Sequence, residues 1–220
     1  MTSLPLFLSI KIAYLCNSEP EAGNGFMVVR CLKCKTGIFI QYLYKAVMVN
    51  EIALEGARNR YREGKPVRVL FVCLGNICRS PAAEGVMRAL VEERGDAALW
   101  EIDSAGTGNY HIGDLPDKRM RIHARRRGYE LTHRCRQVCE CDFDDFDLIV
   151  GMDAMNLRNL HAIAPTPEAG GKIVGMGEFF DIATRYDHVP DPYYEGAEGF
   201  ELVLDLLQSG CGRLYEEVAG

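Results

Sequence analysis

Residues 67–81 read VRVLFVCLGNICRSP, and they decide the fold of this chain. The first six residues are apolar apart from one arginine, which predicts a buried strand. Apolar residues then recur at three- and four-residue spacing, which predicts a helix with Ser80 as its N-cap and Pro81 in its first position. Between strand and helix lies a short glycine-containing loop. Its N–H groups and the positive end of the helix dipole converge on one point, so we expect an anion site there.

The rest of the chain repeats the alternation of strand and helix. Strands are expected at Arg68–Val72, Leu99–Ser104, Leu148–Met152 and Lys172–Gly175, and helices at Pro81–Glu93, Asp117–Arg127, Asp153–Ile163 and Glu198–Tyr215. This order predicts an α/β fold of three layers, a four-stranded parallel sheet with helices on both faces. The anion site then lies beyond the carboxyl ends of the strands, where such folds bind ligands.

Composition bounds the class of protein. The 220 residues are 48% hydrophobic and 25% charged, which indicates a globular chain rather than a disordered or collagenous one. No apolar run approaches the length of a membrane span, so we expect no membrane insertion. Nine cysteines cannot all pair, and free thiols indicate a reducing compartment, here the cytoplasm. The net charge of −6, concentrated after residue 66, argues against nucleic acid as a partner.

Residues 1–66 carry little information and are expected to form an extension of unknown role. The segment makes a poor secretory signal, and it is either disordered or an upstream stretch before a true start at Met27 or Met48. An amphipathic helix is expected over Asn50–Arg62. We expect a chain lacking residues 1–65 to keep its function nearly intact.

Two residues of the loop select its chemistry. Cys73 opens the loop and Arg79 closes it, with five residues between them. The loop lacks the glycine-lysine ending of a nucleotide-binding loop and the glycine spacing of a dinucleotide fingerprint. Loop amides and a guanidinium facing Cys73 would lower its pKa from about 8.5 into the range of roughly 3.5–7.5, which makes it a nucleophile. Arg79 offers planar, bidentate donors for phosphoryl oxygens.

Five segments in order carry a family resemblance: VLFVCLGNICRSP at 69–81, DSAGT at 103–107, HRCRQ at 133–137, FDLIVGMD at 146–153 and DPYY at 191–194. With them, residues 67–220 resemble the low-molecular-weight protein tyrosine phosphatases, which have a flavodoxin-like fold. The resemblance implies that Cys73 attacks phosphorus to form a cysteinyl-phosphate and that Arg79 holds the phosphoryl oxygens. It implies that Asp191 is the general acid for the leaving oxygen and then the base for water.

The resemblance also implies supporting residues. The phosphate-binding loop comprises Leu74, Gly75, Asn76, Ile77, Cys78 and Ser80, with the Ser80 hydroxyl stabilising the thiolate. Asn76 is expected in the left-handed conformation, held by Ser104 and His133. The slot for an aromatic ring is expected from Leu74, Tyr110, Tyr193 and Tyr194, and the two tyrosines of the DPYY segment also resemble regulatory phosphorylation sites. The expected partner is a phosphotyrosine protein or a small aryl phosphate, with no cofactor or metal, acting as a monomer or weak homodimer.

Other functions of the same fold stay open. Protein arginine phosphatases usually carry threonine where Ile77 stands, and thiol-based arsenate reductases use a loop cysteine with two downstream thiols, for which Cys135, Cys139 and Cys141 are candidates. A silent or redox-sensing module that binds phosphorylated ligands is a third possibility.

The cysteines other than Cys73 have several possible roles. In the family, a cysteine placed like Cys78 forms a reversible disulfide with the nucleophile, and the plain alternative is a small buried hydrophobic residue. Cys31 and Cys34 are spaced like half of a zinc site, for which Cys139 and Cys141 are the only other close pair.

Overall fold

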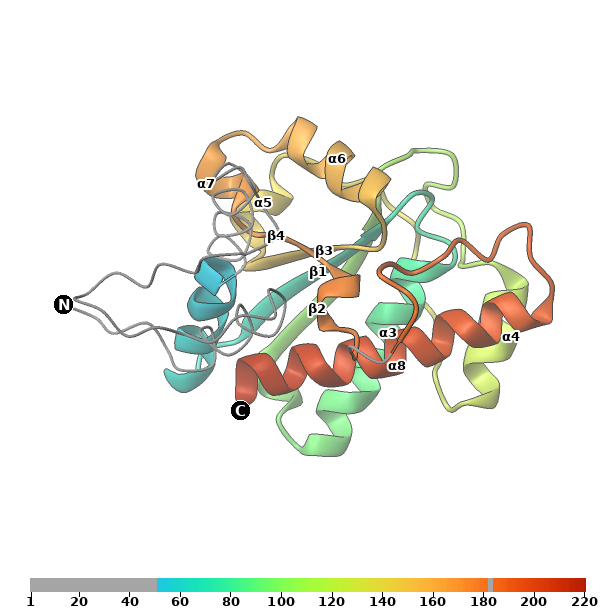
Figure 1. Cartoon of the computed structure of the whole chain (residues 1–220), viewed down its shortest axis with the longest axis horizontal. Coiled ribbons are helices and arrows are strands. Elements are labelled where there is room, and N and C mark those ends of the chain that lie inside the picture. The colour runs from blue at the N-terminus through green and yellow to red at the C-terminus, as the bar shows by residue number, and fades with distance from the viewer. Residues whose placement is uncertain (1–50, 182–183) are drawn as a thin grey trace, which may run out of the picture. The chain divides into compact units, whose positions relative to one another are not determined.

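The computed structural model describes residues 51–181 and 184–220, and a compact unit spans Met48–Gly220. A helix over 51–62 comes first. It is followed by β1 (Val67–Cys73), α3 (Arg79–Arg94), η1 (Ala97–Leu99), β2 (Trp100–Gly106), α4 (Lys118–Arg126), α5 (Asp142–Asp145), β3 (Leu148–Gly151), α6 (Ala154–Ile163), α7 (Pro167–Gly170), β4 (Ile173–Gly175), η2 (Met176–Phe179) and α8 (Ala197–Ala219) (Figure 1).

The sheet has four parallel strands in the order β2-β1-β3-β4. Cys73 pairs with Gly106 on one side of β1, and Phe71 pairs with Val150 on the other. The chain therefore leaves β1 toward one neighbour and later returns to the opposite side. Such a switch in strand order opens a crevice at the carboxyl end of the central strand. The predicted parallel sheet is confirmed, with each strand end within two residues of its expected place.

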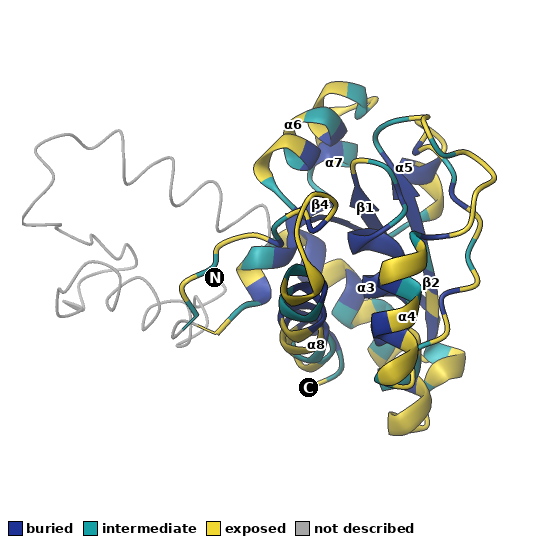
Figure 2. Ribbon diagram, turned by 90° about the vertical axis from the view of Figure 1, so that its right-hand side faces the viewer, coloured by how far each residue is buried: buried dark blue, intermediate teal, exposed yellow. Residues whose placement is uncertain are grey.

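Alternate residues of β1 divide the core into two layers. Val69 and Phe71 join a buried cluster with residues of α3 and α8, whereas Leu70 and Val72 join a second cluster with α5 and α6. Figure 2 shows the buried strands between these helices, whose outer surfaces are exposed. The fold is thus the three-layer α/β arrangement predicted from the sequence, with successive residues of the central strand buried on opposite faces of the sheet.

The start of α3 differs from the expectation. The helix begins at Arg79, its N-cap is Cys78, and no side chain caps it, so Ser80 is not the N-cap and Pro81 is not the first helical residue. The physical reason is that the Ser80 hydroxyl lies 3.1 Å from the Cys73 sulfur and 3.1 Å from the Ala105 carbonyl oxygen. The first turn of the helix is therefore joined to Cys73, at the place where the sequence predicts an anion site.

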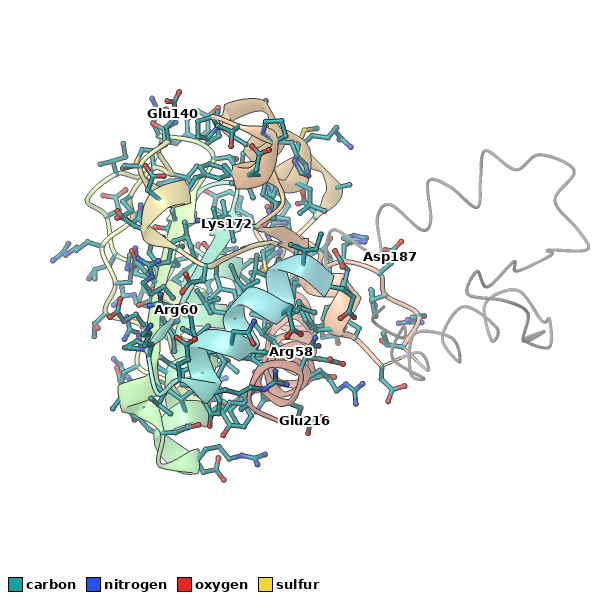
Figure 3. All side chains as sticks on the ribbon, turned by 90° about the vertical axis from the view of Figure 1, so that its left-hand side faces the viewer. Arg58, Arg60, Glu140, Lys172, Asp187 and Glu216 are labelled. Atoms are coloured by element: carbon teal, nitrogen blue, oxygen red, sulfur yellow. A yellow bond between two sulfur atoms is a disulfide. The ribbon has the colours of Figure 1, made fainter. Side chains whose placement is uncertain are left out.

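The helix over 51–62 belongs to the same compact unit as the sheet. Ala53, Leu54 and Ala57 are buried in the cluster on the α3 and α8 face. Arg58, labelled on this helix in Figure 3, donates from Nε to the Glu217 carbonyl oxygen at 2.6 Å and from Nη2 to the carboxylate of the same residue at 2.9 Å. The boundary expected at residue 66 thus differs from the structure, in which the folded unit begins before β1.

Several expectations lie outside the described residues, among them a start at Met27 and a zinc site with Cys31 and Cys34. Within 51–181 and 184–220, no helix combines the length and apolar character that crossing a bilayer requires.

Candidate active site

The loop after β1 presents unpaired backbone donors. Cys73, at its start, is buried, and the carbonyl oxygens of Cys73 and Leu74 accept from the N–H groups of Thr107 and Gly108 at 2.8 Å. Among the described residues, no protein group accepts from the N–H groups of Leu74 to Arg79. A row of free amides at the end of a buried strand, opening a helix, suits an anion.

Gly106 allows the loop to lie close to β2. A Cβ atom at this position would stand 2.8 Å from the Leu74 carbonyl oxygen and 3.0 Å from the Asn76 nitrogen. Such distances are too short for a side chain, so the neighbouring strand must present bare backbone here.

Asn76 fixes the conformation of the loop. Its φ is 56°, the left-handed conformation that the sequence analysis expects. Its buried side chain donates to the hydroxyls of Ser80 and Ser104 at 3.0 Å. Its Oδ1 accepts from His133 Nε2 at 3.0 Å and from the Arg136 N–H at 2.9 Å. Every hydrogen-bonding atom of this amide side chain has a partner, which holds the strained residue in place.

The Ser80 hydroxyl lies between two acceptors. Its oxygen is 3.1 Å from Cys73 Sγ and 3.1 Å from the Ala105 carbonyl oxygen, and it accepts from Asn76. A hydroxyl has one proton, so it donates to one acceptor at a time. Ionisation of Cys73 would favour donation to sulfur, because hydrogen bonds to charged acceptors are the stronger ones.

Arg79 is buried and holds two carboxylates. Nη1 donates to Asp153 Oδ2 at 2.5 Å and to the Val189 carbonyl oxygen at 3.3 Å, while Nη2 donates to Asp191 Oδ2 at 2.7 Å. Burial alone would lower the pKa of Arg79, but negative charge on Cys73, Asp191 and Asp153 outweighs it and raises this pKa. The guanidinium is a permanent positive charge facing the thiol.

Asp191 lies in the loop between η2 and α8 and remains half-exposed. In addition to its contact with Arg79, its Oδ1 accepts from the Tyr193 N–H at 3.1 Å. The structure thus brings Asp191, which is 112 positions away in the chain, to Arg79 at the end of the loop that Cys73 opens. A cavity at the carboxyl ends of β3 and β4 is lined by Asp153 and Asp191 but not by Cys73.

The four residues expected for the aromatic slot are all exposed, to different extents. Leu74 and Tyr110 are exposed, and a Cβ on Gly108 would collide with the Tyr110 ring, so this glycine lets the ring lie over the turn. The Arg119 guanidinium carbon lies 5.3 Å from the centroid of the Tyr193 ring. The Tyr193 and Tyr194 rings pack edge to face. Tyr194 is 94% exposed, so it forms at most the outer rim.

Glu84 and Asp103 support the loop and were not predicted from the sequence. Glu84 Oε2 accepts from the Ser104 hydroxyl at 2.7 Å and lies 3.3 Å from His133 Nδ1, which is 3.4 Å from Asp103 Oδ1. Glu84 is one helical turn after Ser80 on the buried face of α3, and a carboxylate on an apolar face is a signal that the sequence does contain.

Glu84, Asp103 and His133 are close enough to one another to be considered as a metal site. Each carboxylate also has a cationic partner, because Arg88 bonds Glu84 and Arg136 bonds Asp103. We therefore interpret the cluster as a hydrogen-bonded support for Asn76 and Ser104.

Arg136 and Asp153 were also missed, although both belong to quoted segments. The Arg136 guanidinium bonds Asp103 and forms a bidentate pair with the buried Asp142 at 2.9 and 3.0 Å. Burial alone would lower the pKa of Arg136, but Asp142 and Asp103 raise it. Asp153 caps α6 through the Asn156 N–H and orients Arg79.

The described cysteines are in different states. Cys73, Cys78, Cys135 and Cys211 are free and buried, whereas Cys139 and Cys141 form a disulfide. The zinc reading is therefore wrong for Cys139 and Cys141 in this state, because bonded sulfurs are not thiolate ligands. The arsenate-reductase reading needs two downstream thiols, and within the described residues Cys135 alone of its three candidates is free; its Sγ donates to the Asn76 carbonyl oxygen.

Comparison with known proteins bears on this site. A family model described as low molecular weight phosphotyrosine protein phosphatase matches residues 68–220. The chain belongs to this family. A low molecular weight protein-tyrosine-phosphatase of Streptomyces coelicolor is 44% identical over 152 residues, which are 69% of this chain and 93% of that protein. Phosphatases are hydrolases, so this chain is an enzyme of the hydrolase class.

Two solved structures extend the similarity to the fold. A protein tyrosine phosphatase from Entamoeba histolytica, solved with Hepes in its active site, is 41% identical with a TM-score of 0.66, covering 68% of this chain and 95% of that one. A Drosophila arginine phosphatase is 34% identical with a TM-score of 0.63, covering 67% and 95%. The family fold therefore accompanies more than one substrate class.

Proposed function

We propose that the chain is a protein-tyrosine phosphatase that hydrolyses phosphotyrosine and aryl phosphates through a cysteinyl-phosphate. The Cys73 thiolate attacks phosphorus, the bond from phosphorus to the aryl oxygen breaks, and Asp191 gives its proton to that oxygen. Support comes from the meeting of Cys73, Arg79 and Asp191 at one loop whose amides are free. This convergence of nucleophile, guanidinium and carboxyl group is the observation that carries the proposal.

The second step returns the enzyme to its first state. Water attacks the phosphocysteine, the sulfur leaves as thiolate, and Asp191 takes a proton from the water as phosphate forms. Loop amides and Arg79 stabilise the negative charge that the phosphoryl group carries in both steps. These groups supply the positive field of the proposed site.

Asp191 has to leave Arg79 before it can act. In this structure it occupies Nη2 of the guanidinium, which a phosphoryl oxygen would need for bidentate binding. A bound phosphoryl dianion would take over this donor and leave the Asp191 carboxyl group facing the leaving oxygen. Substrate binding and positioning of the acid are then one event.

The proposal is tested by the dependence of rate on the leaving group. We expect wild-type protein to hydrolyse p-nitrophenyl phosphate and phenyl phosphate, and Cys73→Ser to hydrolyse neither. Asp191→Ala should lose on the order of 10²-fold or more in kcat on phenyl phosphate, and less on p-nitrophenyl phosphate, whose leaving group needs less protonation. Equal losses on both substrates would remove Asp191 from the role of acid, and turnover by Cys73→Ser would remove the intermediate.

A protein arginine phosphatase is the second candidate, because the Drosophila arginine phosphatase shares the fold and a third of the aligned residues. Ile77 weighs against an arginine phosphatase, because these proteins usually carry threonine at this position of the loop. Hydrolysis of a phosphoarginine peptide and a phosphotyrosine peptide of the same sequence separates the two. We expect faster release of phosphate from the phosphotyrosine peptide. An Ile77→Thr variant should bring the two hydrolysis rates closer together.

The proposed mechanism also constrains where the protein works. Cys73 acts as a thiolate, so we propose a reducing compartment, the cytoplasm, and a phosphotyrosine protein as partner. A monomer or weak homodimer remains our expectation, which sedimentation velocity would test.

A further inference from the structure

Cys139 and Cys141 form an exposed disulfide that the proposed hydrolysis does not use. One residue, Glu140, separates them, and Figure 3 shows it at the outer edge of the molecule. The disulfide lies between the segment that pairs with Gly106 and the start of α5. An exposed disulfide is open to attack by a thiolate from solution, unlike the buried thiols of Cys78, Cys135 and Cys211.

The disulfide turn holds the buried carboxylate of Asp142. The Cys139 N–H donates to Asp142 Oδ2 at 2.8 Å, and the Cys139 carbonyl oxygen accepts from the Asp142 N–H at 3.2 Å. Cys139 Sγ itself lies 3.4 Å from the same carboxylate oxygen. Reduction would place a thiol proton on that sulfur, beside an oxygen that already accepts from Arg136 Nη1 at 3.0 Å. The oxidation state of the pair therefore alters the surroundings of one buried carboxylate.

Asp142 is linked to the anion-binding loop through Arg136. Its two oxygens bind the Arg136 guanidinium, and the Arg136 N–H donates to Asn76 Oδ1 at 2.9 Å. The Arg136 carbonyl oxygen accepts from the Gly106 N–H at 2.9 Å, which fixes the same residue to the strand under the loop. Asn76 is the described non-glycine residue with positive φ, so its side-chain partners are needed to hold it.

We propose that Cys139 and Cys141 are a thiol–disulfide exchange site whose oxidation state sets how firmly Arg136 holds Asn76. In the oxidised state the closed turn fixes Asp142 on Arg136 and stiffens the loop. In the reduced state the turn can open, and the Asp142 carboxylate accepts from the Cys139 thiol as well as from Arg136. The link to phosphate binding rests on the function proposed above, whereas the link to loop mobility does not.

The exchange chemistry balances with a low-molecular-weight disulfide as oxidant. A thiolate of the reduced pair attacks one sulfur of glutathione disulfide, the sulfur–sulfur bond of glutathione breaks, and one glutathione thiolate leaves. The second protein thiol, as thiolate, attacks the mixed disulfide and releases the second glutathione. Two protein thiols lose two protons and two electrons, and one disulfide becomes two thiols. A dithiol such as dithiothreitol drives the reverse reaction.

The test uses the full chain with Cys73→Ser and Cys78→Ser, so that no disulfide can form within the loop. Samples are equilibrated with glutathione disulfide or with dithiothreitol. Peptide mapping by mass spectrometry identifies the pair that forms, and hydrogen exchange measures the amides of residues 74–80. Calorimetry measures the dissociation constant for inorganic phosphate. We expect the oxidised state to exchange more slowly and to bind phosphate about twofold to tenfold more tightly.

Three variants in this background separate the steps. Cys139→Ser with Cys141→Ser should abolish the redox effect, and Asp142→Asn should abolish it while the disulfide still forms. The matched control, Cys31→Ser with Cys34→Ser, removes the other closely spaced pair and should leave the effect unchanged.

Three outcomes overturn the inference: no Cys139–Cys141 disulfide with glutathione disulfide, equal loop exchange in both states, or an effect that follows Cys31 and Cys34. Absence of phosphate binding in both states would count against the proposed function instead, and the hydrogen exchange would still decide the coupling.

Discussion

Arg79 donates from Nη2 to Asp191 Oδ2 across 2.7 Å, although the two residues are 112 positions apart in the chain. The pair joins the first turn of α3 to the loop before α8. Since Asp153 binds Nη1, both terminal nitrogens of the Arg79 guanidinium already donate to carboxylates of the protein itself. Under the proposed function, a phosphoryl group that enters the site has to compete with the Asp191 carboxylate for Nη2.

Replacing Arg79 by lysine keeps the charge and removes the fork. We expect Arg79→Lys to lower kcat/KM for p-nitrophenyl phosphate by roughly 10²- to 10³-fold, because one ammonium cannot bind two phosphoryl oxygens in a plane. Steady-state kinetics measure the change. Arg213→Lys, on the exposed face of α8, is the matched control and should have no effect. A loss within threefold for Arg79→Lys would contradict this role.

Asp153 should stabilise the fold in a pH-dependent way. Burial would raise the pKa of its carboxyl group, but hydrogen bonds from the Asn156 N–H and from Arg79 outweigh burial and lower it. Its stabilisation is therefore present above the unfolded-state pKa of about 3.9 and is lost as the pH falls through the lower folded-state pKa.

Urea unfolding at a series of pH values tests this assignment. The free energy of unfolding of wild type should exceed that of Asp153→Asn most clearly near neutral pH, and the difference should shrink below about pH 4. Glu168→Gln, an exposed change on α7, serves as control. A difference that stays constant from neutral to acidic pH would speak against the ion pair as its source.

Leu54 tests whether the helix over 51–62 is part of the folded unit. Its side chain is buried, so we expect Leu54→Ala to lower the free energy of unfolding by about 2–4 kcal/mol, as for other buried leucines. Ile52 on the same helix is 66% exposed, so Ile52→Ala should change the free energy of unfolding only slightly. For the same reason we now expect deletion of residues 1–65 to destabilise the protein, and deletion of residues 1–47 to be tolerated. Equal stability of the two truncated chains would contradict the packing of this helix.

Gly106 should be sensitive to the smallest side chain. A methyl group there meets the backbone of Leu74 and Asn76, so Gly106→Ala should displace the loop and lower kcat/KM by about tenfold or more. Gly212→Ala on α8 has open space around the added methyl group and should leave activity unchanged. Unchanged kinetics for Gly106→Ala would show that the loop tolerates such a shift.

Cys78 should react slowly in the folded protein. Burial, followed by the charge of Asp117, raises the pKa of Cys78 well above its usual range, so the thiol is neutral at physiological pH. In a Cys73→Ser background at pH 8, we expect iodoacetamide to modify Cys78 at least about tenfold more slowly than in the urea-unfolded chain. Mass spectrometry of the loop peptide gives both rates. Equal rates would contradict a buried neutral thiol, whereas slow labelling implies that any oxidation of the loop starts at Cys73.

The strand, loop and helix around Cys73 could be predicted because local pattern and motif agree there. The short helices α5 and α7 were not expected, since four residues give too little periodicity to detect. Nor could the partners of Asn76 be predicted in full. Glu84 and Arg136 act through contacts across the sheet, and nothing in their own segments indicates which residue each one meets. The helix over 51–62 was expected from its periodicity, but its packing on α8 depends on contacts more than 150 residues away in sequence.

The contact between Arg58 and Glu217 brings the beginning and the end of the compact unit together. Neighbouring ends are what circular permutation requires, because a short linker can join them without crossing the core. New termini opened in the exposed turn near Gly113 would leave the order of strands in the sheet intact. The loop between Cys73 and Arg79 would then lie far from the chain ends in both the natural and the permuted protein. A reporter domain could be inserted at either junction.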